Sequence, residues 1–448
     1  MHRFIVVGGG AGGLELATRL GDRYGKKKNG AARALVTLVD RNPTHIWKPL
    51  LHEVAAGSMD PFTQELEYAA QARWHGFEFQ QGELAGLDRK GKKIMLAPVL
   101  DDDGAELLPE RELEYDTLVI AIGSTTHFFG VQGAPEHSIA LDTVQQAERF
   151  RKRLIAACMR AEHQEYARVE CGDGMSPDNE ARIQVAIVGG GATGVELSAE
   201  LRNTAQVLSA YGLHKLDPRH DVGIVLIEAG PRILPALTER VSGATAELLT
   251  KLGVKLMIGE TVAEVAPGLV RTASGKTVRA DLTVWAAGIK APAILAKLDG
   301  LPVNRLGQLQ VRRTLQSEND DNIFALGDCA ACQWPGSERN VPPRAQAAHQ
   351  QASFLLKSLV NRMDGRPLAE FTYRDFGSLV SLGHFSAVGN LMGGLIGGSM
   401  LIEGLFARFM YMSLYRLHIA ALHGYPRMML DTFAHWLRRT TLPRVKLH

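Results

Sequence analysis

The sequence predicts an α/β fold with two Rossmann-like domains, one inserted into the other, on three observations. A glycine fingerprint occurs twice, as Gly8-x-Gly10-x-x-Gly13 and as Gly189-x-Gly191-x-x-Gly194. Each copy follows a short apolar run and opens a helical stretch, which is the setting of a dinucleotide-binding turn. Two further segments, 115–124 and 281–288, resemble each other, which indicates that the chain is internally duplicated.

The glycines allow the backbone to turn tightly and to approach a pyrophosphate, which then lies at a helix N-terminus. An acidic residue at the end of the second strand of each unit should bind the adenosine ribose. Asp40 and Glu228 have this position, and the alternative is that they only end their strands. A carboxylate at Glu228 would accept the 2′-hydroxyl of NADH and repel the 2′-phosphate of NADPH. We interpret the following Arg232 as an ordinary turn residue.

A third motif indicates which dinucleotide each unit holds. Residues 322–328 read as a strand that runs into Gly327-Asp328. This segment resembles the second signature of flavoproteins with two dinucleotide-binding domains, in which the aspartate binds the ribityl chain of FAD. The resemblance implies that the N-terminal unit binds FAD without a covalent bond and that the inserted unit binds NADH.

Composition excludes several classes of function. The net charge is +2 and aromatic residues make up 6% of the chain, so no basic and aromatic surface for nucleic acid is expected. The chain enters its first strand at once, which leaves no room for a secretory signal. Cys329-x-x-Cys332 directly follows Asp328 and lacks a second Cys or His pair, so we interpret these cysteines as bystanders and expect no metal site.

The C-terminal region differs from the rest of the chain in charge and pattern. After a glycine-rich stretch at 389–398, residues from 400 onward carry seven Lys or Arg and two acidic residues, a net charge of +5 against +2 for the whole chain. In the last helix, apolar and polar side chains fall on opposite sides of the helical wheel. The apolar side contains Met429, Phe433, Trp436 and Leu437, and the polar side contains Arg427, Asp431, His435 and Arg438.

A basic amphipathic helix with aromatic residues on its apolar side is typical of an interfacial membrane anchor. The alternatives are a helix that packs on the body or lies in a homodimer interface. No window reaches the roughly 18 uncharged apolar residues of a membrane span. We therefore expect an FAD-binding domain at 1–140 and 301–385, a helix and loop connection at 141–182, an NADH-binding domain at 183–300, and a membrane-association region at 386–448.

With these motifs the chain resembles the type II NADH dehydrogenases of proteobacteria, which are single-subunit NADH:quinone oxidoreductases. The runs that support the resemblance are 45–54 (HIWKPLLHEV), 285–290 (WAAGIK), 345–350 (AQAAHQ) and the tail from 398 to 448. The resemblance covers essentially the whole chain.

The resemblance implies roles for further residues. Gln346 and Gln350 match the family segment beside the flavin and the quinone head group, and Lys48 falls within the first supporting run and is assigned to the FAD site. Glu196 matches a glutamate near the place where nicotinamide meets flavin, with a helix-start acid as the alternative. Some members have a lysine near the quinone; here the corresponding segment has none, and either His384 or water supplies the proton.

The resemblance also implies the activity. Hydride would pass from NADH to FAD, and two electrons would then pass to a membrane quinone such as ubiquinone in a respiratory chain, without proton pumping. The expected setting is a peripheral homodimer on the anionic cytoplasmic face of the bacterial inner membrane. The alternatives are a soluble disulfide or peroxide reductase, a sulfide:quinone oxidoreductase, and a non-catalytic flavin-bound sensor.

Overall fold

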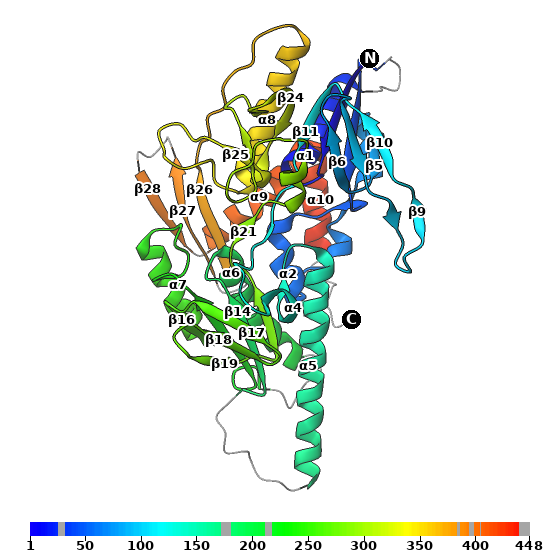
Figure 1. Ribbon diagram of the computed structural model, residues 1–448. Coiled ribbons are helices and arrows are strands. Elements are labelled where there is room, and N and C mark those ends of the chain that lie inside the picture. Colours follow the sequence, from blue (N-terminus) through cyan, green and yellow to red (C-terminus); the bar gives the residue numbers. More distant parts are fainter. Residues whose placement is uncertain are drawn as a thin grey trace.

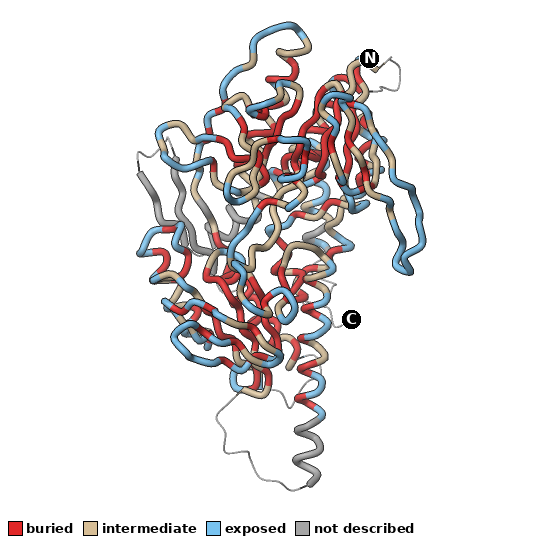
Figure 2. The backbone as a smooth tube through the Cα atoms, viewed as in Figure 1, coloured by how far each residue is buried: buried red, intermediate tan, exposed pale blue. Residues whose placement is uncertain are grey.

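The computed structural model describes residues 1–25, 32–171, 181–210, 217–382, 386–393, 398–403 and 405–438. Two sheets dominate it, a mostly parallel mixed sheet in the upper half of Figure 1 and a parallel sheet in the lower half. Buried residues concentrate in both sheets, as the red segments of Figure 2 show. The α/β class with two Rossmann-like units is therefore confirmed.

The first sheet joins strands from both ends of the described sequence. Its central strand β1 (His2–Val7) pairs in parallel with β2 (Ala34–Asp40) and β11 (Thr117–Ile120), and β11 pairs in parallel with β24 (Asp320–Ala325). The strand order is β25-β22-β23-β24-β11-β1-β2-β5. The outer strands are β5 (Glu78–Gln81), β22 (Leu309–Val311), β23 (Gln316–Ser317) and β25 (Ala330–Cys332). Because β24 returns next to β11, the second unit is an insertion, as predicted.

The second sheet has the order β13-β20-β14-β15-β16. Its strands are β13 (Ile139–Ala140), β14 (Ile183–Val188), β15 (Val222–Glu228), β16 (Val254–Ile258) and β20 (Leu282–Trp285). The apolar runs of the central strands β14, β15 and β20 are mostly buried, as in parallel sheets covered on both faces, whereas the edge strand β16 is partly exposed. The strands before both fingerprints and the strands that end at Asp40 and Glu228 lie where the sequence predicts them.

The helices that position the site follow from the fingerprints and from apolar periodicity. They are α1 (Ala11–Tyr24), α2 (Leu51–Ala56), α3 (Tyr68–His75), α5 (Val144–Cys171), α6 (Ala192–Ala210), α7 (Glu239–Lys251) and α8 (Ala345–Met363). The long helix α5 buries Phe150 and Leu154 in the same core as Val185 and Leu201. The helix expected in the connecting segment thus packs on the inserted sheet.

Smaller antiparallel pairs extend from the two sheets. They comprise β3 (Thr44–His45), β4 (Leu66–Glu67), β6 (Leu84–Asp88), β7 (Lys93–Leu96), β8 (Val99–Leu100), β9 (Glu106–Leu108), β10 (Arg111–Glu114), β12 (Thr125–Thr126), β17 (Val262–Ala266), β18 (Leu269–Thr272), β19 (Thr277–Arg279) and β21 (Ile289–Lys290). The exposed β8–β9 hairpin projects from the first domain in Figure 2.

The C-terminal region begins with an antiparallel sheet that the sequence analysis does not anticipate. Strands β26 (Gly377–Leu382), β27 (Ser386–Gly393) and β28 (Gly398–Glu403) pair side by side across the boundary expected at 385. Ladder hydrogen bonds on both sides of β27 offset the weak strand preference of its glycines.

Two helices, α9 (Leu405–His423) and α10 (Tyr425–Arg438), follow this sheet and confirm the expected helical end. Among the described residues, none of the helices combines the length and the apolar character needed to cross a bilayer.

Candidate active site

The two fingerprint loops have the same backbone geometry. The first glycine of each has a positive φ, 102° at Gly8 and 113° at Gly189. A Cβ on the third glycine would lie 1.9 Å from the Gly8 carbonyl oxygen in the first loop and 2.0 Å from that of Gly189 in the second. These positions therefore require glycine for both conformation and close approach.

The middle glycines meet open space instead. A Cβ placed on Gly10 or Gly191 finds no heavy atom within 4 Å. Helices α1 and α6 start at the next residue, so their free N–H groups and positive dipole ends face that space. Each loop thus offers a dinucleotide pyrophosphate both room and hydrogen-bond donors.

The acidic residues at the strand ends lie against these loops. Asp40 accepts a hydrogen bond from the Gly9 N–H (2.7 Å), and Glu228 accepts bonds from the N–H groups of Gly190 and Gly230 (2.6 Å each). Burial raises the pKa of Asp40. Both carboxylates are held beside their loop, at the position that a ribose next to the pyrophosphate would reach.

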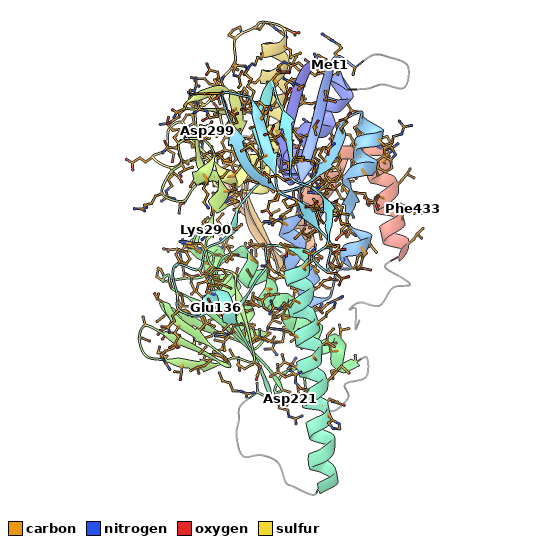
Figure 3. The ribbon with its side chains drawn as sticks, turned by 45° about the vertical axis from the view of Figure 1, so that its right-hand side comes forward. Met1, Glu136, Asp221, Lys290, Asp299 and Phe433 are labelled. Atoms are coloured by element: carbon orange, nitrogen blue, oxygen red, sulfur yellow. The ribbon has the colours of Figure 1, made fainter. Side chains whose placement is uncertain are left out.

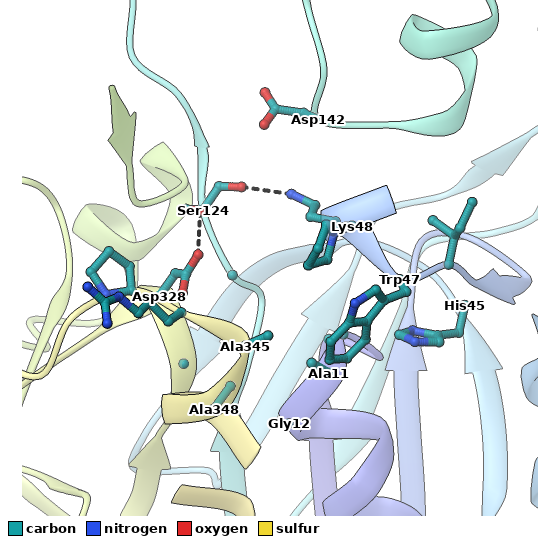
Figure 4. Close-up of a pocket in the computed structure, with 18 of the residues that line it drawn as sticks. Ala11, Gly12, His45, Trp47, Lys48, Ser124, Asp142, Asp328, Ala345 and Ala348 are labelled. Atoms are coloured by element: carbon teal, nitrogen blue, oxygen red, sulfur yellow. Dashed lines mark hydrogen bonds between the residues drawn. The ribbon is translucent and has the colours of Figure 1, made fainter. Parts of the chain in front are cut away.

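One cavity of about 1890 Å³ joins the two units. Its walls include Gly8, Gly10, Asp40 and Lys48 from the first unit and Gly191 and Glu196 from the second. Helices α8 and α9 contribute Gln346, Gln350, Tyr415 and His418. The close-up in Figure 4 shows Ser124 and Asp328 on the left and Lys48, Trp47 and His45 to their right, with Ala11 below Trp47. A cavity of this size accommodates more than one dinucleotide-sized group.

Asp328 is positioned on the cavity wall by its neighbours. The Ser124 hydroxyl donates to the Asp328 carboxylate (2.8 Å), and Lys48 Nζ donates to the Ser124 carbonyl oxygen (3.1 Å), as the dashed lines of Figure 4 mark. Burial raises the pKa of Asp328, and the Lys48 charge opposes that rise. The carboxylate can accept hydrogen bonds from a polyol chain in the cavity.

Glu196 lies at the junction of the inserted domain and the C-terminal sheet. Its Oε1 accepts a hydrogen bond from the Ser381 N–H (3.0 Å), and its Oε2 lies 3.5 Å from Nδ1 of His52. Burial lowers the pKa of His52 to about 4, so this imidazole is neutral at pH 7. Glu196 is buried apart from the part that lines the cavity.

Gln346 and Gln350 both line the cavity, but their amides already have partners. Gln350 Nε2 donates to the Arg374 carbonyl oxygen (2.8 Å), and its Oε1 accepts from the Arg374 N–H (3.0 Å). Gln346 Nε2 donates to the Gly377 carbonyl oxygen (3.0 Å) and to Asp375 Oδ1 (3.2 Å). These bonds fasten segment 374–377 to the first turns of α8. His384 lies outside the described residues.

Several cavity residues are not singled out by the sequence analysis. His349 on α8 pairs with the fully buried Glu15 of α1, and His418 on α9 contacts His45. His349 belongs to the Ala/Gln/His run, but nothing in the sequence links it to Glu15. His418 is a polar residue within an apolar helix, which is a signal, but its partner 373 positions away is visible only in the fold.

The cysteines after Asp328 are buried and free. Burial raises the pKa of the Cys329 thiol to about 12 and that of Cys332 to about 11. Thiolates are the reactive form of cysteine, so this setting disfavours redox or nucleophilic chemistry at these two residues.

The chain is similar in sequence to known proteins. The family model described as pyridine nucleotide-disulphide oxidoreductase matches residues 2–352. The chain is 43% identical over 451 residues to the type II NADH:quinone oxidoreductase of Haemophilus influenzae, with 100% of both chains covered. It is 28% identical over 403 residues to the enzyme of that name from Staphylococcus aureus, covering 88% of this chain and 91% of the relative.

A solved structure of NDH2 from Plasmodium falciparum in complex with NADH has the same fold. Its TM-score is 0.80 at 18% identity, and the match covers 100% of this chain and 99% of that one. The family model and the relative from Haemophilus influenzae establish the family of this chain in addition to its fold. The chain belongs to the pyridine nucleotide-disulphide oxidoreductase family and, within it, to the type II NADH:quinone oxidoreductases.

Proposed function

We propose that this protein oxidises NADH and reduces a membrane quinone, with FAD as its resident cofactor and without pumping protons. The observation that carries the proposal is the single cavity on which both fingerprint loops open. Bound FAD supplies the group that accepts a hydride from NADH and returns two electrons to the quinone. The protein supplies binding, orientation and electrostatics.

We assign FAD to the first loop and NADH to the second. Asp328 and Lys48 line the cavity on the side of the first sheet, where a ribityl chain that extends from the Gly10 loop would pass. Glu228 belongs to the second loop, and its carboxylate favours NADH over NADPH there. The domain boundaries given in the sequence analysis follow the same assignment.

We assign Glu196 a role in orienting the nicotinamide. It lies in the first turns of α6, close to Gly191, and the Ser381 N–H fixes its carboxylate. His52 beside it is neutral, and Glu196 lines the cavity, where its carboxylate can accept a hydrogen bond from a ligand amide. A fixed acceptor of this kind selects the carboxamide orientation of a bound nicotinamide.

We place the quinone head group between α8, segment 374–377 and α9. Gln346 and Gln350 hold segment 374–377 at the cavity wall, and a direct hydrogen bond to a quinone oxygen requires one of these amides to exchange a backbone partner. The proton donor suggested at His384 stays a prediction, as does the homodimer.

We infer that α10 attaches the protein to an anionic membrane surface as a peripheral protein. Met429, Leu430 and Phe433 are 67%, 70% and 58% exposed, so this side of the helix faces away from the body of the protein. Phe433 lies at the outer edge of the molecule in Figure 3. Quinones partition into lipid, so attachment at this helix brings the cavity to its second substrate.

The test is NADH oxidation by the flavin-loaded protein with and without a short-chain quinone. We expect fast turnover that depends on quinone. Reduction of the flavin by NADH without quinone turnover would remove the proposed activity and favour a soluble reductase or a sensor.

A second experiment tests membrane attachment by sedimentation with vesicles of phosphatidylglycerol and phosphatidylcholine. We expect Met429→Ser/Leu430→Ser to lose vesicle binding. The matched control is Leu107→Ser/Leu108→Ser, which removes two exposed apolar side chains from the β9 hairpin. Equal binding of both variants would contradict the assignment to α10.

A further inference from the structure

The C-terminal helices contact residues 45–75 of the FAD domain, in addition to the packing of α9 on α1 and on the sheet of β26, β27 and β28. The Tyr415 hydroxyl donates to Gln64 Oε1 (2.9 Å), and Gln71 Nε2 lies 3.0 Å from Nε2 of His423. On α10, the Arg427 guanidinium lies 5.6 Å from the centre of the Trp74 ring. Stretch 45–75 begins five residues after Asp40, so α9 and α10 contact the part of the FAD domain that flanks the first fingerprint loop.

The central contact of this docking surface is a buried pair of histidines. His418 Nε2 lies 3.0 Å from His45 Nε2, and the His418 ring lies 4.3 Å from the Trp47 ring between centroids. His45 Nδ1 lies 2.9 Å from the carbonyl oxygen of Gly9, the residue between the first two fingerprint glycines. His45 and His418 are each 4% exposed, so water does not substitute for these bonds.

The hydrogen-bond chemistry fixes the direction of this chain of contacts. A carbonyl oxygen only accepts, so His45 Nδ1 carries a proton and donates to Gly9. Burial lowers the pKa of His45 to about 4 and, reinforced by the charges of His45, His349 and His423, lowers the pKa of His418. Both rings are therefore neutral at pH 7, His45 Nε2 has a free lone pair, and His418 Nε2–H donates to it.

We propose that the pair His418–His45 is a positioning device through which helix α9 fixes the first fingerprint loop, residues 8–13, in the conformation that binds FAD. The device runs from α9 through two imidazoles to the Gly9 carbonyl, while the Gly9 N–H is held by Asp40 on the other side. The His418–His45 contact and the retention of FAD are then linked, and each stabilises the other. This inference rests on the assignment of FAD to the first loop.

The test is the rate at which full-length, FAD-loaded protein releases FAD, followed by the rise of flavin fluorescence after dilution. His418→Leu removes the donor and keeps an apolar side chain beside Trp47, and we expect it to speed FAD release about tenfold because a buried acceptor loses its partner. His418→Gln keeps an N–H donor at the same reach and should restore slow release. Arg427→Gln, which removes the contact of α10 with Trp74 but not the pair, is the matched control and should release FAD at the wild-type rate.

Release from His418→Leu at the wild-type rate, in protein whose circular dichroism is unchanged, would overturn the proposal. Equally fast release from His418→Leu and His418→Gln, or from Arg427→Gln, would also overturn it, because helix docking in general would then be responsible. Failure of the FAD assignment itself has a different signature. In that case Gly10→Val, which adds a side chain where the loop faces the cavity, would purify with a full complement of FAD.

Discussion

The two nucleotide loops are nearly identical in backbone, yet the protein holds their second glycines differently. In the second loop, the Gly190 carbonyl oxygen accepts a hydrogen bond from the Leu234 N–H of the same domain (2.7 Å). In the first loop, the Gly9 carbonyl oxygen accepts bonds from two buried side chains, His45 Nδ1 (2.9 Å) and the Tyr68 hydroxyl (2.8 Å). The first loop is thus fixed by two buried side chains and the second by one backbone group, and one of the two side chains leads to the C-terminal helix.

The difference matches what each ligand must do. FAD is a resident cofactor that stays through every turnover, whereas NADH is a substrate whose product must leave. A carbonyl held by two side chains is released only when both contacts break, while a carbonyl held by one backbone N–H is released when that single bond breaks. With FAD assigned to the first loop and NADH to the second, as proposed, the same fingerprint would serve retention in one unit and exchange in the other.

The largest expected effect comes from blocking the ligand space of each fingerprint loop in turn. Gly10→Val and Gly191→Val both add a side chain that meets no protein atom but points into the space of the pyrophosphate. We expect Gly10→Val to lose FAD entirely and Gly191→Val to keep FAD while its KM for NADH rises steeply. Flavin absorbance and steady-state kinetics measure the two outcomes, and thermal melting confirms that both variants fold. FAD loss in Gly191→Val instead would reverse the assignment of the sites.

The next largest effect is expected from the carboxylates of Asp40 and Glu228. Glu228→Gln weakens the ribose contact and removes the charge that repels a 2′-phosphate, whereas Asp40→Asn makes the same change in the other loop. Because a hydrogen bond to a charged group contributes about 1.5–3 kcal/mol, we expect kcat/KM for NADH to fall roughly tenfold or more in Glu228→Gln. The ratio of NADPH to NADH activity should rise in that variant and stay unchanged in Asp40→Asn. An unchanged ratio in both variants would exclude Glu228 as the selectivity residue.

The sequence is most informative where local chemistry repeats. The two fingerprints, their acidic strand ends and the Gly327-Asp328 turn predict both Rossmann units and the order of the ligands, because each feature is a short-range requirement on backbone shape. The antiparallel sheet of β26, β27 and β28 escapes this approach. In the sequence its glycines suggest a flexible linker. Only the pairing between the strands gives this segment a regular secondary structure.

In the candidate site, too, some features follow from local sequence motifs and others only from tertiary contacts. Glu196 and Asp328 are suggested by their places in a motif, but their neighbours Ser381 and Ser124 arrive from 185 and 204 positions away. The family resemblance assigns Gln346 and Gln350 to the quinone, but in the structure their amides form hydrogen bonds with segment 374–377. The partner of a polar side chain depends on tertiary contacts, which a single sequence does not contain.

The two units should also differ in their response to acid. Burial lowers the pKa of both His45 and His52 in the FAD unit to about 4, against about 6.5 in an unfolded chain. The unfolded state then binds more protons than the folded state between these values. The stability that these residues contribute is complete above pH 6.5 and is lost as the pH falls towards 4, by about 1.4 kcal/mol per pKa unit for each histidine.

We therefore expect FAD to be released at a lower temperature at pH 5 than at pH 7.5, which flavin fluorescence during heating measures. His45→Asn, which keeps an N–H near the Gly9 carbonyl but does not titrate, should reduce this difference. Asp40 and Asp328 act in the opposite direction, since burial raises the pKa of each. Equal pH dependence in wild type and His45→Asn would show that this histidine is not responsible.

The smallest expected effect isolates one of the two bonds to Gly9. Tyr68→Phe removes the hydroxyl donor but leaves His45 on the same oxygen, so the carbonyl keeps a partner. The ring still packs against Phe79, at 5.1 Å between centroids. A neutral hydrogen bond contributes about 0.5–1.5 kcal/mol net, so FAD release should quicken by roughly two- to tenfold while the KM for NADH stays the same. If release is unchanged in Tyr68→Phe and fast in His418→Leu, the imidazole alone holds the loop; if both are unchanged, the contrast between the two loops does not control retention.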